Sequence, residues 1–137
     1  MEPDDRIDAA IALSFVTYYT GAESVGDKDH MWALTALDDL AIDDPLRAWK
    51  IIGMINATRV DDPRGREMLY AVIGCGPLGE IIALHTDVML PKILKAAEGD
   101  AALCAQLSEI EEDAVGPEIW QEIQSVLARR SPTHSRQ

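Results

Sequence analysis

Apolar residues recur along this chain at intervals of three or four, and acidic residues, glycine and proline divide the pattern into short segments. Apolar side chains at this spacing lie on one face of an α-helix. The first two segments predict helices over residues 4–20 and 30–40, with a loop over 21–29 between them. Their predicted buried stripes are Ile7, Ile11, Phe15 and Tyr18, and then Met31, Leu34, Leu37 and Leu40.

Proline marks the start of most later segments. Asp-Asp-Pro occurs at 43–45 and again at 61–63, and an Asp that caps free N–H groups before a Pro in the first turn is typical of a helix start. Gly76-Pro77, Pro91, Gly99-Asp100 and Gly116-Pro117 predict four further helix starts. The apolar residues after these starts are Ala48, Ile51, Ile52 and Ile55; Leu69, Val72 and Ile73; Leu78, Ile81, Ile82 and His85; Ile93, Leu94 and Ala97; Leu103, Leu107 and Ile110; and Ile119, Ile123, Val126 and Leu127.

The pattern therefore predicts an all-α fold of about eight short helices. An aromatic content of 5% in a chain that is 47% apolar favours close-packed helices over a sheet. Short loops predict antiparallel helix hairpins, arranged either as a compact bundle or as a short helical-repeat-like stack. Trp49 and Trp120 lie beside apolar runs and are expected in the core or at its edge. A chain of 137 residues suits one helical domain over 1–130, followed by a disordered tail over 131–137.

The charge of the chain indicates what kind of partner the protein could bind. The formal net charge is −12, and residues 1–45 contain eleven Asp and Glu against Arg6 and Lys28 alone. Such a field repels nucleic acid and anionic lipid and attracts basic protein surfaces. The simpler explanation is that the acids cap helices and keep the surface solvated. Capping does not account for the scarcity of bases among them, so we expect a basic partner.

The candidate contact face lies where these acids are densest. Asp38, Asp39, Asp43 and Asp44 cluster around the predicted end of the second helix. Trp32 belongs to the same helix, and tryptophan is common at the energetic centre of protein interfaces. These five residues are the predicted partner-binding site.

One motif suggests a different chemistry. Gly74 to Gly79 fits G-x-G-x-x-G, in which glycines let a pyrophosphate approach a helix N-terminus. Residues 64–73 also fit an amphipathic helix, however, and no second strand ending in an acid follows. Gly76-Pro77 is therefore better explained as a helix end followed by a helix start. A nucleotide-binding enzyme that uses Gly74 to Gly79 is the least favoured of three functions.

Other catalytic and metal-binding patterns are incomplete. The segment from Asp27 begins like a calcium loop, but it has Met31 at the fifth position and no Gly at the sixth. Three scattered histidines do not make a zinc site, and His85 is expected to be packed and hydrogen-bonded. Cys75 and Cys104 are expected to be small buried apolar residues. We therefore predict no catalytic residue, no metal site and no cofactor.

Several short motifs appear in a recognisable order. Asp44-Pro45 precedes Ala48-Trp49, then Gly76-Pro77-Leu78 follows, and His85 comes a few residues later. This order resembles a family of small bacterial all-helical proteins of uncharacterised function, over a little more than half of the chain. The family has Glu after Gly-Pro-Leu, where this sequence has Gly79 followed by Glu80. The resemblance implies a helical fold and brings no established activity.

The expected function is binding rather than catalysis. We expect a cytoplasmic protein with a basic protein partner, most concretely an immunity or antitoxin-like inhibitor that covers a basic site on a toxin. The alternative is a helical adaptor or scaffold that binds a peptide or a subunit in a groove between hairpins. Charge or Gly and Pro interrupt each apolar run before the roughly 18 residues of a membrane span. We expect no nucleic-acid and no membrane partner, and homo-oligomerisation stays open.

Overall fold

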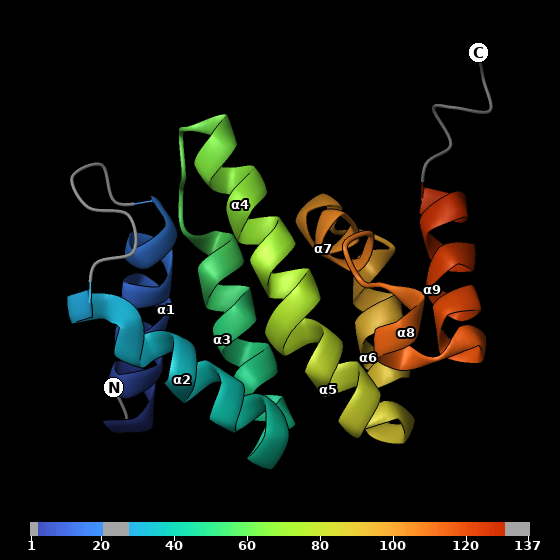
Figure 1. The fold of residues 1–137 in the computed structure, drawn as a ribbon, viewed down its shortest axis with the longest axis horizontal. Helices are drawn as coiled ribbons and strands as arrows, with labels where there is room; N and C mark the ends of the chain where they lie inside the picture. The colour runs from blue at the N-terminus through green and yellow to red at the C-terminus, as the bar shows by residue number, and fades with distance from the viewer. Residues whose placement is uncertain (1–2, 21–27, 131–137) are drawn as a thin grey trace.

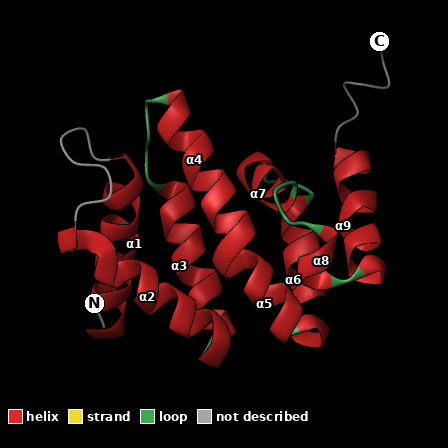
Figure 2. Ribbon diagram, in the orientation of Figure 1, coloured by secondary structure: helices red, strands yellow, loops and turns green. Residues whose placement is uncertain are grey.

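Helices account for nearly all of the residues that the computed structural model describes, which are 3–20 and 28–130 (Figure 1). Figure 2 shows no strand in these two ranges, so the predicted all-α fold is confirmed there. Most of the predicted loop over 21–29, and the predicted tail over 131–137, lie outside the described residues. The elements are α1 (Pro3–Thr20), α2 (Lys28–Asp43), α3 (Pro45–Ala57), α4 (Pro63–Ile73), the π-helical turn η1 (Gly74–Leu78), α5 (Gly79–Leu84), α6 (Thr86–Ala97), α7 (Ala101–Leu107), α8 (Glu112–Val115) and α9 (Pro117–Arg130).

Aspartate caps begin three of these helices, as the sequence predicts. The carboxylate of Asp44 accepts the N–H of Arg47 at 3.3 Å at the start of α3. Asp62 and Asp100 cap α4 and α7 in the same way, at 3.2 Å and 3.0 Å. Each cap satisfies one N–H group that has no partner within its own helix. One aspartate of each pair at 43–44 and 61–62, the second, therefore has a structural role as a helix cap.

The predicted helix end and helix start at Gly76-Pro77 are confirmed, because the backbone of Gly76 is non-helical and two helices meet there at a kink within the run Pro63–Leu84. Pro77 has no N–H, and in an α-helix its ring would clash with the carbonyl four residues earlier. The wider π-helical turn Gly74–Leu78 and the non-helical backbone of Gly76, at φ −108° and ψ −109°, accommodate the proline instead. In the described ranges, α8 adds a short helix that the pattern did not predict, so eight helical elements form with Pro63–Leu84 counted as one.

Pro91 does not begin a helix, so the helix start predicted at this proline is wrong. It lies inside α6, and the chain breaks earlier, at His85, where φ is −131° and ψ is 43°. Pro91 is exposed, so the carbonyl that it leaves without an N–H partner is on the solvent side of α6. A proline on the outer face of a helix is thus compatible with a helix that starts one turn or more before it.

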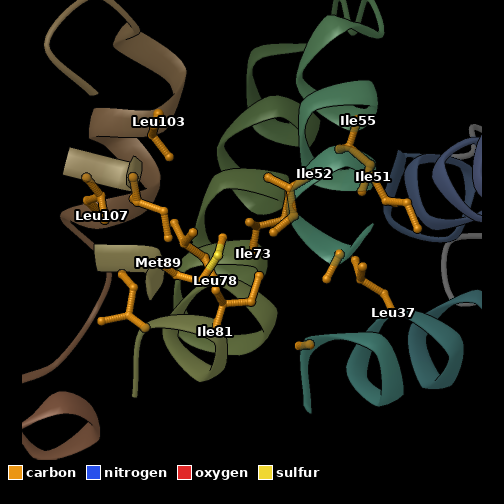
Figure 3. Packing of buried hydrophobic residues seen from close by; sticks show 14 of the residues in the cluster. Leu37, Ile51, Ile52, Ile55, Ile73, Leu78, Ile81, Met89, Leu103 and Leu107 are labelled. Atoms are coloured by element: carbon orange, nitrogen blue, oxygen red, sulfur yellow. The ribbon is translucent and has the colours of Figure 1, made fainter. Parts of the chain in front are cut away.

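One apolar cluster joins all parts of the described fold. Figure 3 shows its side chains converging from α2, α3, the Pro63–Leu84 run and the helices that follow. Figure 1 shows the Pro63–Leu84 run in the middle, with α1 to α3 on one side and α6 to α9 on the other. The largest fully buried side chains are Leu37, Ile51, Ile52, Ile55, Ile73, Leu78, Ile81, Ile82, Met89, Ile93, Leu103 and Leu107.

The first two predicted stripes need correction. Ile7 and Met31 are exposed by 50% and 45%, although both were expected in the core. In α1 the buried stripe starts one residue later, at Asp8, and in α2 it runs through alanines such as Ala33 and Ala41. Small residues let α2 approach α1 and α3 closely. Because alanine also suits exposed helix positions, the apolar pattern alone did not select these alanines as core.

Candidate functional site

All five residues of the predicted contact face are exposed at the surface of the molecule. Trp32, Asp38, Asp39 and Asp43 belong to α2, and Asp44 lies between α2 and α3. Trp32 retains 47% of its accessible surface. Trp49 and Trp120 are half-buried, as expected for residues at the edge of the core.

Helical geometry separates these five residues into groups. Residues seven and eleven positions apart lie within about 20° of one another around a helix with 100° per residue, so Trp32, Asp39 and Asp43 share one stripe of α2. Asp38 lies on the neighbouring stripe, which also carries Ile42. Asp44 is directed to the first turn of α3, whose N–H it accepts. The coherent surface is therefore Trp32, Asp39 and Asp43, which we call the α2 stripe.

The acids of α2 lie at the end of the helix where negative charge is unfavourable. Asp43 is the last residue of α2, Asp38 and Asp39 lie about one turn earlier, and no base occupies the last turn. The carbonyl end of a helix carries a partial negative charge that favours cations and disfavours carboxylates. In the parts of the chain that the structure describes, no ion pair involves any of these three aspartates. Their placement lowers the stability of α2, unlike that of the capping aspartates.

A glutamate that the contact-face prediction left out lies close to this region. Partial burial, and then the charge of Asp39, raise the pKa of Asp38 above its ordinary range. Burial, and then the charge of Asp38, likewise raise the pKa of Glu80 on α5. Both shifts mean that the charged carboxylates are disfavoured where α2 packs beside α5. Glu80 lies 42 positions after Asp38, so local patterns give no sign of this proximity.

Bases on α3 form ion pairs with the acids in the first turns of α1. The carboxylate of Asp8, which is fully buried, lies 2.7 Å from Nε of Arg47 and 2.6 Å from Nζ of Lys50. Lys50 also reaches Asp5 at 3.1 Å. Hydrogen bonding to Asp8 raises the pKa of both bases, so both stay charged. The first turns of α1 are thus neutralised in space, whereas the acids of α2 are not.

His85 joins the end of α5 to the end of α2. Its ring Nε2 lies 2.8 Å from the carbonyl oxygen of Ile42, one of the last carbonyls of α2. A helix leaves its final carbonyls without partners, and an imidazole N–H that donates to one of them acts as a cap. The ring is half-buried, and the predicted packed and hydrogen-bonded histidine is confirmed.

Two of the three glycines in Gly74 to Gly79, the first and the last, lie where the backbone packs closely, and the motif forms no strand-to-helix turn. Residues 63–73 are helical, so the strand that a dinucleotide motif requires before it is not present there. A Cβ on Gly74 would lie 2.1 Å from the carbonyl oxygen of Gln106 on α7, and a Cβ on Gly79 would lie 3.0 Å from the carbonyl oxygen of Gly74. Because 2.1 Å is too short for any Cβ contact, residue 74 must be glycine as long as α7 packs this closely against it.

The expected burial of both cysteines is wrong for Cys75. Its thiol is exposed, donates to the carbonyl of Glu109 at 3.3 Å, and borders a surface pocket of about 360 Å³. Partial burial, and then the charges of Glu109 and Glu111, raise the pKa of Cys75. A raised pKa keeps the thiol protonated and lowers its nucleophilicity. Cys104 is half-buried, with its sulfur 3.1 Å from the carbonyl of Ala97.

Residues 3–20 and 28–130 contain no group of three or more His, Cys, Asp or Glu that could hold a metal ion. Pro63–Leu84, taken across its kink at Gly76, is long and apolar enough to cross a membrane, with mean hydropathy 1.4. The same run supplies Leu69, Ile73 and Leu78 to the core.

No model of a known protein family, no curated protein and no solved structure matches the chain. The family resemblance drawn from short motifs therefore stays a prediction.

Proposed function

We propose that this protein is a non-catalytic binding module whose α2 stripe recognises a basic surface on another protein. The observation that carries the proposal is the position of Asp39 and Asp43 near the carbonyl end of α2, on the same stripe as the exposed Trp32 and without an ion pair to any residue that the structure describes. Residues that lower the stability of their own helix commonly serve a function outside the fold. A cationic partner would turn this unfavourable charge into a favourable interaction.

The most concrete form of this function is an immunity or antitoxin-like inhibitor. A toxin that acts on nucleic acid or nucleotides carries a basic site, and a compact acidic surface can cover that site. Charge would speed the encounter, and burial of Trp32 would slow dissociation. The structure contributes a rigid helix that presents one aromatic and two acidic side chains along a single line.

A comparison of two double variants tests this function. Asp39→Asn with Asp43→Asn removes two charges from the α2 stripe, and Glu112→Gln with Glu118→Gln removes two exposed charges from α8 and α9 as the control. We expect a basic partner to co-purify with the wild type and the control, to dissociate as salt is raised, and to be lost from the α2 variant. That partner should be toxic when it is produced alone. Equal retention by both double variants would contradict the proposal.

The same α2 variant has a predicted effect on stability. Asp39→Asn and Asp43→Asn should raise the free energy of unfolding by a few tenths of a kcal/mol up to about 1 kcal/mol, because neutral side chains no longer oppose the helix dipole. Urea unfolding measures this change. A variant that is more stable and binds less well separates loss of a contact from loss of the fold.

A groove between α6 and α9 favours the adaptor as a second candidate function. It has a volume of about 430 Å³ and is bordered by Leu94 and Val126. Charged residues also lie at its edge, namely Lys95, Glu98, Glu122 and Arg129. An apolar floor with charges of both signs suits a peptide held mainly by apolar burial. Binding that is insensitive to salt and is abolished by Leu94→Glu, but unaffected by Asp39→Asn, would support the adaptor instead.

A further inference from the structure

Three exposed apolar residues lie close to His85, either in sequence or through its hydrogen bond to Ile42, where α5 ends and α6 begins. Leu84 and Val88 are exposed by 56% and 65%, and Ile42 at the end of α2 is exposed by 46%. Leu84, His85 and Val88 also line a surface pocket of about 440 Å³. We call Ile42, Leu84 and Val88, together with His85, the His85 patch. Exposed apolar residues that gather in one place are a mark of interaction sites.

The hydrogen bond from His85 holds this patch in one arrangement. Since Nε2 of His85 lies 2.8 Å from the carbonyl of Ile42, the end of α2 and the start of α6 are fixed beside the same ring. Three different helices therefore contribute to a surface whose parts this bond ties together. A preformed surface loses little conformational entropy when it binds.

The charges around the patch restrict what can cover it. Asp43 follows Ile42 directly, Asp87 lines the pocket, and Glu80 lies one turn before Leu84 on α5. No Lys or Arg is among the residues that line this pocket. Arg47 and Lys50 of α3 pair with Asp5 and Asp8 of α1. The exposed Lys92 lies one turn after Val88 on α6, so the acids near the patch outnumber the bases three to one. The exposed apolar residues at the centre of the patch and the acids around it together favour an occupant whose apolar side chains are flanked by positive charge.

We propose that the His85 patch is the apolar part of the binding surface and holds a cationic, amphipathic segment of the partner protein. The inference rests on the proposed function, because it names the kind of segment that the basic partner would insert. A second copy of this chain would bring the same acids against one another, which is unfavourable. An anionic lipid surface is disfavoured for the same reason.

Two synthetic peptides with equal charge provide the test. One has Leu and Lys at helical spacing, and the other has Ser in place of each Leu. With isotope-labelled protein, we expect the Leu/Lys peptide to shift the backbone amide signals of 42–43 and 84–88, and the Ser/Lys peptide to bind at least tenfold more weakly. Leu84→Ser with Val88→Ser should weaken Leu/Lys binding about tenfold. Met68→Ser, which changes an apolar residue on α4 that is 48% exposed, should leave it unchanged.

The outcomes separate the two proposals. Equal affinity for both peptides, or binding that Leu84→Ser with Val88→Ser does not alter, overturns the His85 patch. If Asp39→Asn with Asp43→Asn still weakens binding in that case, the proposed function stands. If the serine variants weaken binding and the asparagine variants do not, the proposed function fails while the patch is retained. Dimerisation of the wild type at rising concentration that Val88→Ser abolishes would assign the patch to a second copy and overturn the proposal. Absence of binding to either peptide overturns it too.

Discussion

The substitution Asp8→Asn tests whether one buried carboxylate fastens α1 to α3. Asparagine has nearly the same shape as aspartate, so the change removes a charge and leaves the packing in place. In the wild type, Oδ1 of Asp8 lies 2.7 Å from Nε of Arg47, and Oδ2 lies 2.6 Å from Nζ of Lys50. The substitution leaves an oxygen for Arg47 and sets an uncharged amide against Lys50.

The expected loss follows from the exposure of the three side chains. Removing one partner of a fully buried ion pair costs about 3–5 kcal/mol, because the remaining charge stays without a partner in the interior. Asp8 is 0% exposed, but the side chains of Arg47 and Lys50 are 26% and 45% exposed. Water can therefore solvate both bases after the substitution. We expect the free energy of unfolding to fall by about 2 kcal/mol, a large part of the ~5–15 kcal/mol typical of a domain.

Urea unfolding followed by far-ultraviolet circular dichroism measures this loss. Asp5→Asn is the matched control, because Asp5 contacts the same lysine at 3.1 Å but is 41% exposed, and an exposed pair contributes at most about 1 kcal/mol. The loss from Asp8→Asn should persist in about 1 M salt, since buried pairs are little screened. If Asp8→Asn costs no more than Asp5→Asn, the carboxylate does not hold the two helices together and the reasoning is refuted.

Two further predictions concern the Pro63–Leu84 run. Gly74→Ala should destabilise the protein by about 2 kcal/mol, because the new Cβ would lie 2.1 Å from the carbonyl oxygen of Gln106. The control Gly53→Ala places its Cβ where nothing lies within 4 Å, so it should be neutral or stabilising by up to about 1 kcal/mol. Equal thermal midpoints for the two variants would contradict this reasoning. Glu80→Gln should raise the thermal midpoint at about pH 7, because burial and Asp38 raise the pKa of Glu80 above its ordinary value of 4.5. A raised folded-state pKa gives stability that is present at low pH and lost as pH rises through it, so the advantage of Gln should disappear as pH falls below 4.5, and a constant advantage at all pH values would disprove the assignment.

Helix starts could be predicted from sequence because they depend on local chemistry. Asp44 and Asp62 cap the helices that follow them, and both Asp-Pro signals were correct. Gly76-Pro77 is also correct as a helix end followed by a helix start, since the backbone of Gly76 is non-helical. Local chemistry does not encode the π-helical turn and the packing of Gly74 against α7 that keep the two helices close to one line. The predicted core stripe of α1 has the correct spacing and the wrong starting point. Arg47, 39 positions along the chain, makes burial of Asp8 favourable in place of Ile7.

The candidate site shows the same division between local and distant causes. Spacing along one helix is enough to separate the α2 stripe of Trp32, Asp39 and Asp43 from Asp38, because it depends only on helical periodicity. The proximity of Asp38 to Glu80 and the bond from His85 to Ile42 depend on how α2 packs against α5. No local pattern encodes that packing, so the His85 patch is visible only in three dimensions.

The kinked helical run Pro63–Leu84 has a consequence for how the molecule can be divided. Its first half packs against α1 and α7, and its second half packs against α2, α6 and α8. A cut within Gly74–Leu78 would leave each fragment with half of this helix and an apolar face without its partner. We expect such fragments to be insoluble apart and to reassemble only when they are produced together, so the π-helical turn is the natural place at which to split this protein into a two-part reporter.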